Sequence, residues 1–146
     1  MAKKSDLKEI VRLLADDELG SKREKYEDPL PEAYYDAFSA IENQSGNQIL
    51  LVIQDEIIIG CLQLTIIPGL ARLGMKRAQI EGVRVDKNYR GQKVGAALFR
   101  EAITIAKSKG CGLIQLTTDK DRKDALRFYE KLGFTSSHEG MKLIID

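Results

Sequence analysis

Apolar residues recur at helical spacing near the start of the chain. Four of them lie at positions i, i+3, i+4 and i+7: Leu7, Ile10, Val11 and Leu14. This spacing predicts an amphipathic helix, and Asp6 with Glu9 three residues later is typical of a capping pair at its start. The polar stretch 16–31 predicts a loop, and a second helix is expected from about Pro31.

Runs rich in β-branched residues follow, and they predict strands. Ile49–Ile53 and Ile57–Ile67 are separated by the short polar turn Gln54-Asp55-Glu56, so we expect an antiparallel hairpin. A further strand is predicted over Arg77–Val85.

The strand Arg77–Val85 carries an irregular apolar pattern. Ala78 and Ile80 share one face by alternation, whereas Val83 and Val85 have the opposite parity. One additional residue at Glu81-Gly82 would restore a single apolar face, and an additional residue in a strand is a β-bulge. The pattern therefore predicts a bulge there.

Helical and strand patterns alternate in the second half of the chain. A helix is predicted from Val94 to about Gly110, followed by a strand over Leu113–Thr117. Together with the strand that ends at Val85, these elements form a strand–helix–strand unit, so the two strands should be parallel with a right-handed crossover.

The last elements are a helix and two short strands. The helix carries Phe128 and Tyr129, and Gly133 is expected to end it. The short strands are expected around Phe134 and over Met141–Ile145. The whole pattern predicts an α/β fold with a mixed central sheet and flanking helices.

Composition limits the class of protein. The chain has 146 residues and a mass of 16.3 kDa, which is enough for one independent core and predicts a single domain over residues 1–146. Lys and Arg total 23 against 22 Asp and Glu, so the net charge of +1 gives no general attraction to nucleic acid. No apolar run approaches the length of a membrane span, and the first residues lack a signal peptide. We therefore expect a soluble, cytoplasmic protein.

The cysteine and histidine content argues against a metal site. Cys61, Cys111 and His138 are the chain's full set of these residue types, fewer than the four ligands of a structural zinc site. Each cysteine lies in an apolar strand-like run, where a reduced thiol behaves as a small hydrophobic residue. We expect no metal.

The junction between the strand ending at Val85 and the helix beginning near Val94 carries the first sign of chemistry. Gly91 and Gly95 permit close approach of a ligand to the backbone, and the start of a helix offers free N–H groups to a phosphate or pyrophosphate. Arg90 and Lys93 add positive charge. The spacing matches neither a P-loop nor a dinucleotide-binding motif, and two glycines that merely shape a turn remain the alternative.

Three segments together resemble the GNAT superfamily of acyl-CoA-dependent N-acyltransferases: Ile80–Val85, Tyr89–Gly95 and Ala125–Phe134. The resemblance implies the single-domain GNAT fold, in which the fourth strand in the family's order is bulged. It also implies acetyl-CoA as a substrate, together with an amine acceptor. Because the family's first strand has only Met1–Lys3 to form it here, we expect that strand to be vestigial.

The resemblance assigns residues to acetyl-CoA. In the family, the bulged strand pairs through its main chain with the pantetheine arm, which here implies Val83, Arg84 and Val85. The following loop and helix start hold the pyrophosphate, which here implies Arg90, Gly91, Gln92, Lys93, Val94, Gly95 and Ala96. Two residues depart from the family pattern. Lys93 stands where a glycine is usual; since a helix start does not demand a positive φ, phosphate binding should persist. Arg122 stands where an asparagine is common, so that contact with the cofactor is in doubt.

The resemblance also implies two catalytic residues. Tyr129 matches the tyrosine beside the sulfur that can protonate the leaving thiolate, and Glu81 stands where several members keep a carboxylate that takes the amine proton, often through water. A backbone N–H near Val83 would stabilise the oxyanion. The alternatives are a core aromatic residue for Tyr129 and a solvated strand residue for Glu81.

The resemblance implies an N-acetyltransferase that moves the acetyl group of acetyl-CoA to a primary amine of a small molecule by direct attack within a ternary complex. The alternatives are an acetyltransferase acting on a protein or peptide amine, and an acyl-CoA-binding sensor or interaction module. The C-terminal half weakly resembles members that acetylate aminoalkylphosphonates. Edge strands such as Met141–Ile145 could pair or exchange between subunits, which leaves a homodimer as an option.

Overall fold

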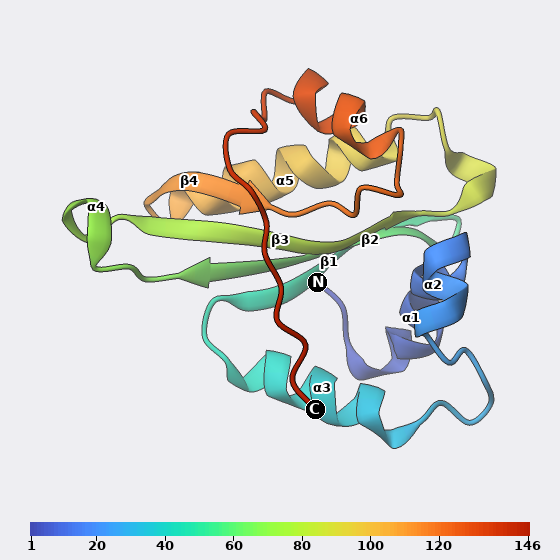
Figure 1. The fold of residues 1–146 in the computed structure, drawn as a ribbon. Coiled ribbons are helices and arrows are strands. Elements are labelled where there is room, and N and C mark those ends of the chain that lie inside the picture. The colour runs from blue at the N-terminus through green and yellow to red at the C-terminus, as the bar shows by residue number, and fades with distance from the viewer. The chain divides into compact units, whose positions relative to one another are not determined.

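Four strands form one mixed sheet in the order β1-β2-β3-β4 in the computed structural model, which describes residues 1–146. The strands are β1 (Asn47–Gln54), β2 (Ile57–Ile67), β3 (Lys76–Val85) and β4 (Cys111–Leu116). Adjacent strands are antiparallel from β1 to β3, whereas β3 and β4 run in the same direction (Figure 1). The α/β fold and the mixed sheet expected from the sequence are thus confirmed.

The chain divides into two units, Met1–Gln115 and Leu116–Asp146. The first unit holds nearly all of the sheet and its covering helices, and the second holds one short helix and the C-terminal residues. The single domain expected over residues 1–146 stays a prediction.

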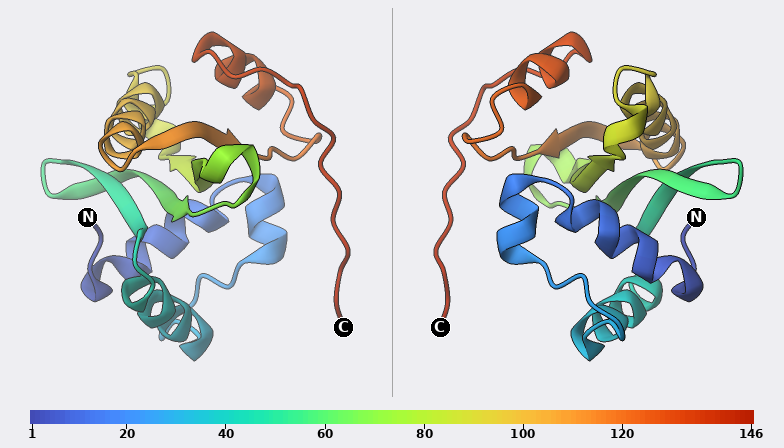
Figure 2. Two further views of the ribbon diagram at one scale, coloured as in Figure 1. Left: turned by 90° about the vertical axis from the view of Figure 1, so that its left-hand side faces the viewer. Right: turned by 90° about the vertical axis from the view of Figure 1, so that its right-hand side faces the viewer.

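Helices cover both faces of the sheet in the first unit (Figures 1 and 2). α5 (Val94–Ser108) packs on one face, and α1 (Leu7–Ala15) and α3 (Glu32–Asn43) pack on the other. The side chains between these layers are fully buried because the alternating apolar faces of the strands meet the apolar stripes of the helices. The largest of them include Leu13, Ile59, Leu62, Leu64, Ile80, Leu98 and Phe99.

Short elements connect these layers. Two of them are single turns of 3-10 helix, at Lys4–Asp6 and Lys87–Tyr89, and two are short helices, α2 (Glu18–Arg23) and α4 (Ala71–Gly74). Before them, Ala2 N–H donates to the Ile49 carbonyl of β1 over 2.8 Å, and no strand forms there.

The second unit contains α6 (Ala125–Lys131), which ends as the sequence predicts. Gly133 has φ of +99°, the left-handed conformation that glycine adopts without steric cost. The N–H of Gly133 donates to the Glu130 carbonyl, and the N–H of Phe134 donates to the Tyr129 carbonyl, at 3.0 and 3.1 Å. This pair of bonds is a Schellman motif, which satisfies the last carbonyls of the helix.

Three local predictions are wrong. Residues 18–23 form α2 rather than a loop, because the Asp17 side chain accepts from the Gly20 N–H and caps the helix. Asp6 does not cap α1; its carboxylate accepts from the Lys3 N–H one turn earlier. No strand forms around Phe134 or over Met141–Ile145, since no helix or strand follows α6.

Candidate active site

The pairing of β2 with β3 shifts register at the place where the sequence pattern changes parity. Cys61 pairs with Arg84 and Gln63 pairs with Glu81, so a step of two residues in β2 faces a step of three in β3. Gly82, inside this step, has φ of +60°. A residue without a counterpart leaves main-chain groups outside the regular ladder, which makes them available to another partner.

Glu81 lies at the edge of this irregular step. Its side chain is exposed, and the residue faces Gln63 across the ladder. The carboxylate is therefore accessible to solvent and to a bound molecule. Val83, Arg84 and Val85 continue the strand and are half-buried.

The loop after β3 leads directly into the longest helix of the chain. Arg90, Gly91, Gln92 and Lys93 are exposed, and Val94, the first residue of α5, is buried against the sheet. Within α5, the first main-chain bond runs from the Ala97 N–H to the Lys93 carbonyl over 3.1 Å. The N–H groups of the preceding helical residues therefore have no partner inside the helix, as at every helix start.

The backbone conformation of Lys93 differs from the one expected from the sequence. It was expected to begin the helix without a positive φ, but its φ of +63° and ψ of +21° are left-handed. The chain must turn sharply between the exposed loop and the buried Val94, and this turn uses the left-handed region. That conformation costs an L-residue roughly 1–2 kcal/mol in free energy, whereas glycine adopts it without this cost.

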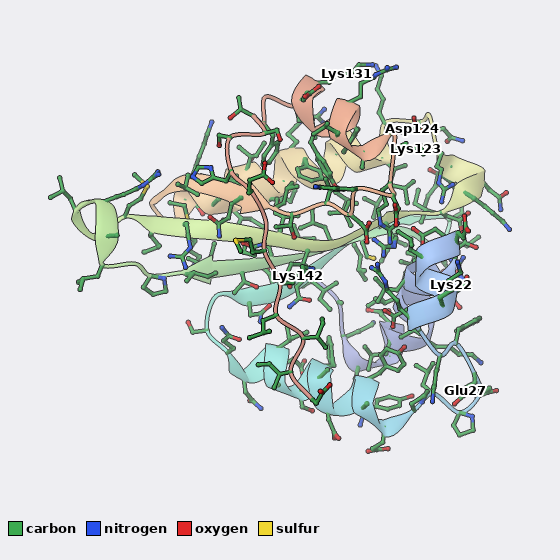
Figure 3. The ribbon with its side chains drawn as sticks, viewed as in Figure 1. Lys22, Glu27, Lys123, Asp124, Lys131 and Lys142 are labelled. Atoms are coloured by element: carbon green, nitrogen blue, oxygen red, sulfur yellow. The ribbon has the colours of Figure 1, made fainter.

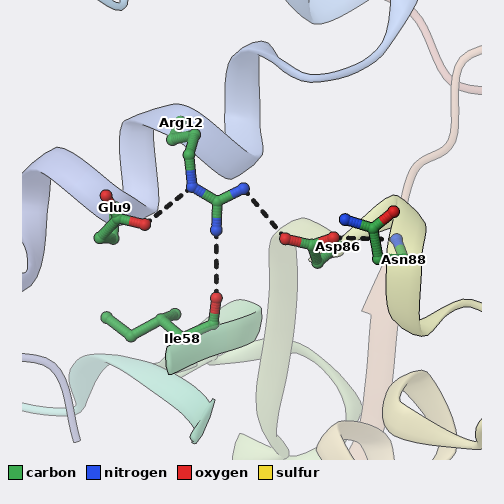
Figure 4. A network of polar contacts seen from close by, with 5 residues as sticks. All are labelled: Glu9, Arg12, Ile58, Asp86 and Asn88. Carbon is green, nitrogen blue, oxygen red and sulfur yellow. Dashed lines mark hydrogen bonds and ion pairs between the residues drawn. The ribbon is translucent and has the colours of Figure 1, made fainter. Parts of the chain in front are cut away.

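A polar network absent from the sequence-based predictions fixes the start of this loop (Figure 4). Asp86, which follows β3, is only 6% exposed. Its carboxylate accepts from the Asn88 N–H at 2.9 Å and from Arg12 Nη1 of α1 at 3.0 Å. Arg12 also donates through Nη2 to the Ile58 carbonyl at 3.2 Å and through Nε to Glu9 at 2.7 Å. One guanidinium therefore joins α1, β2 and the loop after β3.

The network also sets the ionisation of Asp86. The Asn88 N–H, followed by the hydrogen bond and charge of Arg12, holds the pKa of this carboxyl below its ordinary value despite its burial. Asp86 thus stays charged and keeps the loop attached. An aspartate directly after an apolar strand is the sequence signal for the local bond to the Asn88 N–H, because aspartate side chains often accept from the backbone two residues on.

Tyr129 lies on α6 in the second unit, between two aromatic rings. The centroid of its ring is 5.4 Å from that of Phe128 and 6.1 Å from that of Phe134, both in edge-to-face geometry. Arg122 precedes the same helix, and its N–H donates to the Asp119 carbonyl at 3.0 Å. Glu81, residues 83–85 and the loop 90–96 therefore belong to the first unit, whereas Tyr129 and Arg122 belong to the second.

The model of the acetyltransferase (GNAT) family matches residues 8–134 of this chain. The chain belongs to this family. The matched region includes β3, the loop after it, α5 and α6, so the resemblance seen in the sequence is confirmed.

Several GNAT relatives have informative names. A glucosamine 6-phosphate N-acetyltransferase of Trypanosoma brucei brucei is 42% identical over 86 residues, which cover 59% of this chain and 56% of that protein. A glucosamine 6-phosphate N-acetyltransferase of Dictyostelium discoideum is 30% identical over a region that covers 70% of this chain and 66% of that protein. This chain thus spans little more than half the length of the first of these relatives.

Solved structures give the same family fold. A Bacillus halodurans C-125 protein described as a transcriptional regulator is 51% identical, with a TM-score of 0.96 over 99% of this chain and 96% of its own. An acetyltransferase of Trypanosoma brucei is 29% identical, with a TM-score of 0.79 over 99% of this chain and 96% of its own.

Cys61 of this GNAT chain is not placed as a nucleophile. Burial raises the pKa of Cys61 to about 11, and its Sγ lies 3.5 Å from the Gly82 carbonyl, to which the thiol donates. Such a thiol is uncharged at neutral pH and cannot form an acyl-enzyme readily. Cys111 is half-buried on β4.

Other candidate sites are outside this region or absent. A cavity of about 360 Å³ lies between β1 and α5, and none of the predicted site residues lines it. No group of three or more His, Cys, Asp and Glu side chains is arranged to hold a metal ion. No helix has the length and apolar character needed to span a membrane.

Proposed function

We propose that this protein transfers the acetyl group of acetyl-CoA to a primary amine of a small molecule. The observation that carries the proposal is the junction of β3 with α5 inside the matched family region. There, a register-shifted strand leads through an exposed loop, which carries the cationic residues Lys87, Arg90 and Lys93, into the start of a 15-residue helix.

The first unit offers complementary groups to the pantetheine arm and to the pyrophosphate of acetyl-CoA. The irregular step in β3 leaves main-chain groups near Val83 for the amide-rich pantetheine arm. The N–H groups at the start of α5, with the helix dipole, suit the pyrophosphate. The exposed side chains of Arg90 and Lys93 add positive charge beside them. Family membership implies acetyl-CoA as the acyl donor.

The chemistry follows from these groups. The amine nitrogen attacks the thioester carbonyl carbon, and a backbone N–H near Val83 donates to the resulting oxyanion. Glu81 accepts the amine proton, directly or through water. The C–S bond then breaks, and the Tyr129 hydroxyl gives its proton to the thiolate. The products are the N-acetylated amine and CoA, with no covalent intermediate on the enzyme.

We propose further that the acceptor carries a phosphoryl group as well as its amine. Three relatives support this by their names. Two are glucosamine 6-phosphate N-acetyltransferases. The third is an aminoalkylphosphonate N-acetyltransferase of Salmonella typhimurium, which is 38% identical over 41% of this chain and 39% of its own. The loop 68–76, which frames the acceptor cleft in the family, exposes Arg72 and Lys76 to receive such an anion.

An acceptor panel tests this proposal through the release of CoA thiol. Glucosamine 6-phosphate and 2-aminoethylphosphonate should be turned over with kcat/KM about tenfold or more above glucosamine and ethanolamine, because a charged hydrogen bond to phosphate adds about 1.5–3 kcal/mol. A peptide with a free N-terminus is the control for protein acetylation. Preference for the peptide would overturn the small-molecule acceptor, and equal turnover of the paired amines would overturn the phosphoryl group.

Two substitutions at Lys93 separate its backbone strain from its charge. Lys93→Gly should raise the free energy of unfolding by about 1 kcal/mol, because it relieves the left-handed strain at φ of +63°. Lys93→Ala keeps the strain. Both variants lose the ammonium group, so both should bind acetyl-CoA several-fold more weakly, which titration calorimetry measures. If Lys93→Gly binds as tightly as the unchanged chain, the ammonium does not engage a phosphate.

A second candidate is a regulatory module that binds acyl-CoA without turnover. The relative described as a transcriptional regulator favours it, since that protein is 51% identical to this chain. Tight acetyl-CoA binding with no CoA release for any amine of the panel would select this candidate over the enzyme.

A further inference from the structure

Uncharged polar side chains gather on one face of the sheet in the first unit. Thr65 of β2 pairs with Asn47 of β1 on one side and with Gln79 of β3 on the other, and Gln63 lies two residues away along β2. Residues paired directly across a sheet point to the same face, and so do residues two apart along a strand. Gln115 of β4 joins this face, since its Nε2 donates to Gln79 Oε1 over 2.8 Å. We call these five residues the polar strip.

The polar strip continues the face on which α1 packs. Cys61, two residues before Gln63 on β2, belongs to the same core cluster as Ile10 and Leu13 of α1. The opposite face of β2 and β3 is apolar and fully buried over the same stretch, where it presents Leu62, Leu64, Ala78 and Ile80. The change from apolar to polar side chains therefore takes place on one face of the sheet alone.

Hydrogen bonds hold the side chains of the polar strip and leave part of their capacity for a ligand. Asn47 Oδ1 accepts from Gln63 Nε2 at 3.0 Å and from Thr65 Oγ1 at 3.2 Å. Gln63 keeps its amide oxygen as an acceptor. Gln79, whose oxygen accepts from Gln115, keeps its amide nitrogen as a donor. The strip thus presents uncharged donors and acceptors in fixed positions.

Two charged residues of β3 lie at the ends of the polar strip. Glu81 and Arg77 stand two residues on either side of Gln79. The pairing of β2 with β3 is regular over this stretch, so the three side chains share one face. Neither Glu81 nor Arg77 forms an ion pair within the chain. Their Cα atoms lie about 13 Å apart, the length of four residues of strand.

The polar strip itself carries no charge, although charged residues make up 31% of the chain. Lys22 of α2 and Glu27 of the loop after it are examples of charged side chains on the helices and loops of the first unit (Figure 3). A solvated surface is usually covered by such mixed charges. An uncharged face between one carboxylate and one guanidinium suits instead a ligand with hydroxyl groups between a cationic and an anionic end.

We propose that the polar strip binds the acceptor and that the acceptor is an amino sugar phosphate. This inference rests on the proposed function and narrows it. The amine lies at Glu81, which takes its proton, and the hydroxyl groups of the sugar contact Thr65 and Gln79. The phosphoryl group lies at Arg77, whose guanidinium donates two parallel hydrogen bonds to its oxygens. A Cβ atom at Gly69 would lie 3.1 Å from Arg77 Nη1, so this guanidinium lies against the loop 68–76 proposed above for the anion.

The length and chemistry of the strip distinguish the two kinds of phosphoryl-bearing amine. An aminoalkylphosphonate joins its amine to phosphorus through a short carbon chain and has no ring hydroxyl groups. An amino sugar phosphate separates the two charges by a hydroxylated ring, and the side chains of Glu81 and Arg77 extend over the rest of the distance. A site that hydrogen-bonds hydroxyl groups also rejects a substrate without them, because its own polar groups would be left unpaired.

Acceptor kinetics of the full chain, followed through the release of CoA thiol, test the polar strip. The unchanged protein should have a kcat/KM for glucosamine 6-phosphate at least about tenfold above that for 2-aminoethylphosphonate. Gln79→Ala and Thr65→Val should each raise the KM for glucosamine 6-phosphate about three- to tenfold, with kcat and the affinity for acetyl-CoA nearly unchanged. Gln48→Ala is the matched control, because Gln48 pairs with Leu64 and lies on the opposite face of the sheet. Circular dichroism establishes that each variant is folded.

Arg77→Ala tests the phosphoryl end of the strip. We expect kcat/KM for glucosamine 6-phosphate to fall about tenfold or more, because a charged hydrogen bond to the phosphoryl group is lost. The value for glucosamine, which has no phosphoryl group, should stay within about twofold. Arg100→Ala is the control, since Arg100 is exposed on α5 away from this face.

The outcomes separate this inference from the proposed function. Turnover of 2-aminoethylphosphonate equal to that of glucosamine 6-phosphate would overturn the amino sugar. A KM that rises no more in Gln79→Ala and Thr65→Val than in Gln48→Ala would show that the strip is a solvated sheet face. Selectivity for the phosphoryl group that persists in Arg77→Ala would remove Arg77 from the site. Release of CoA with none of the amines would contradict the proposed function itself, and this inference with it.

Discussion

Tyr129→Phe should lower kcat more than tenfold and leave the affinity for acetyl-CoA nearly unchanged. Removal of the hydroxyl takes away the proton that the leaving thiolate requires, and proton transfer by a positioned side chain contributes about 100-fold or more to catalysis. The ring itself stays, with its contacts to Phe128 and Phe134. Steady-state kinetics with a saturating amine gives kcat, and calorimetry gives the affinity.

The same substitution distinguishes the catalytic role from a packing role. If Tyr129 serves only as an aromatic residue of the core, phenylalanine should replace it with little change in kcat. Tyr26→Phe is the control, since Tyr26 is 44% exposed and lies outside the predicted site. The pH profile of kcat adds a second readout, because loss of the acid should alter its alkaline limb, which a packing defect would not move. Unchanged turnover would remove Tyr129 from the mechanism.

Arg12→Met should cost about 3 kcal/mol of the free energy of unfolding, the largest effect expected on stability. The side chains of Arg12 and Asp86 are 26% and 9% exposed, so the substitution leaves a mostly buried carboxylate without its cationic partner. Urea denaturation near neutral pH measures the change. Glu9→Gln is the control; its carboxylate is 44% exposed and should contribute less than about 1 kcal/mol. A loss for Arg12→Met no greater than for Glu9→Gln would contradict the structural role of the network.

The same network predicts how stability depends on pH. The pKa of Asp86 is lower in the folded protein than its ordinary value of 3.8, because of the Asn88 N–H and then Arg12. Asp86 therefore contributes stability that is fully present above about pH 4 and is lost as the pH falls through its folded pKa. In Arg12→Met this loss should begin at a higher pH. Denaturation curves between neutral and acidic pH test the shift, and Asp86→Asn should remove the contribution altogether.

The regular elements were predictable because hydrophobic periodicity reports burial directly. The hairpin, α5 and the end of α6 at Gly133 follow from local patterns, and so does the position of the register shift in β3. The helix α2 was missed because its six residues are too few to show a periodicity, and the Asp17 cap that stabilises it is a single contact.

Features that depend on distant residues could not be predicted from the sequence. Arg12 and Asp86 are 74 positions apart, and no local pattern pairs them. The left-handed Lys93 follows from the direction in which the loop must meet the sheet, which spacing alone does not give. Met141–Ile145 has the composition of a strand but does not form one, because a strand also requires a paired neighbour, which composition alone does not supply.

The central claim is that the junction of β3 and α5 binds acetyl-CoA, and calorimetric titration tests it most directly. We expect binding in the micromolar range for acetyl-CoA and for CoA. Dephospho-CoA should also bind, since it keeps the pyrophosphate that the start of α5 and Arg90 are proposed to hold. Absence of binding by all three would contradict both the enzyme and the regulatory module, and would leave a GNAT fold whose surfaces, rather than its cleft, carry its role.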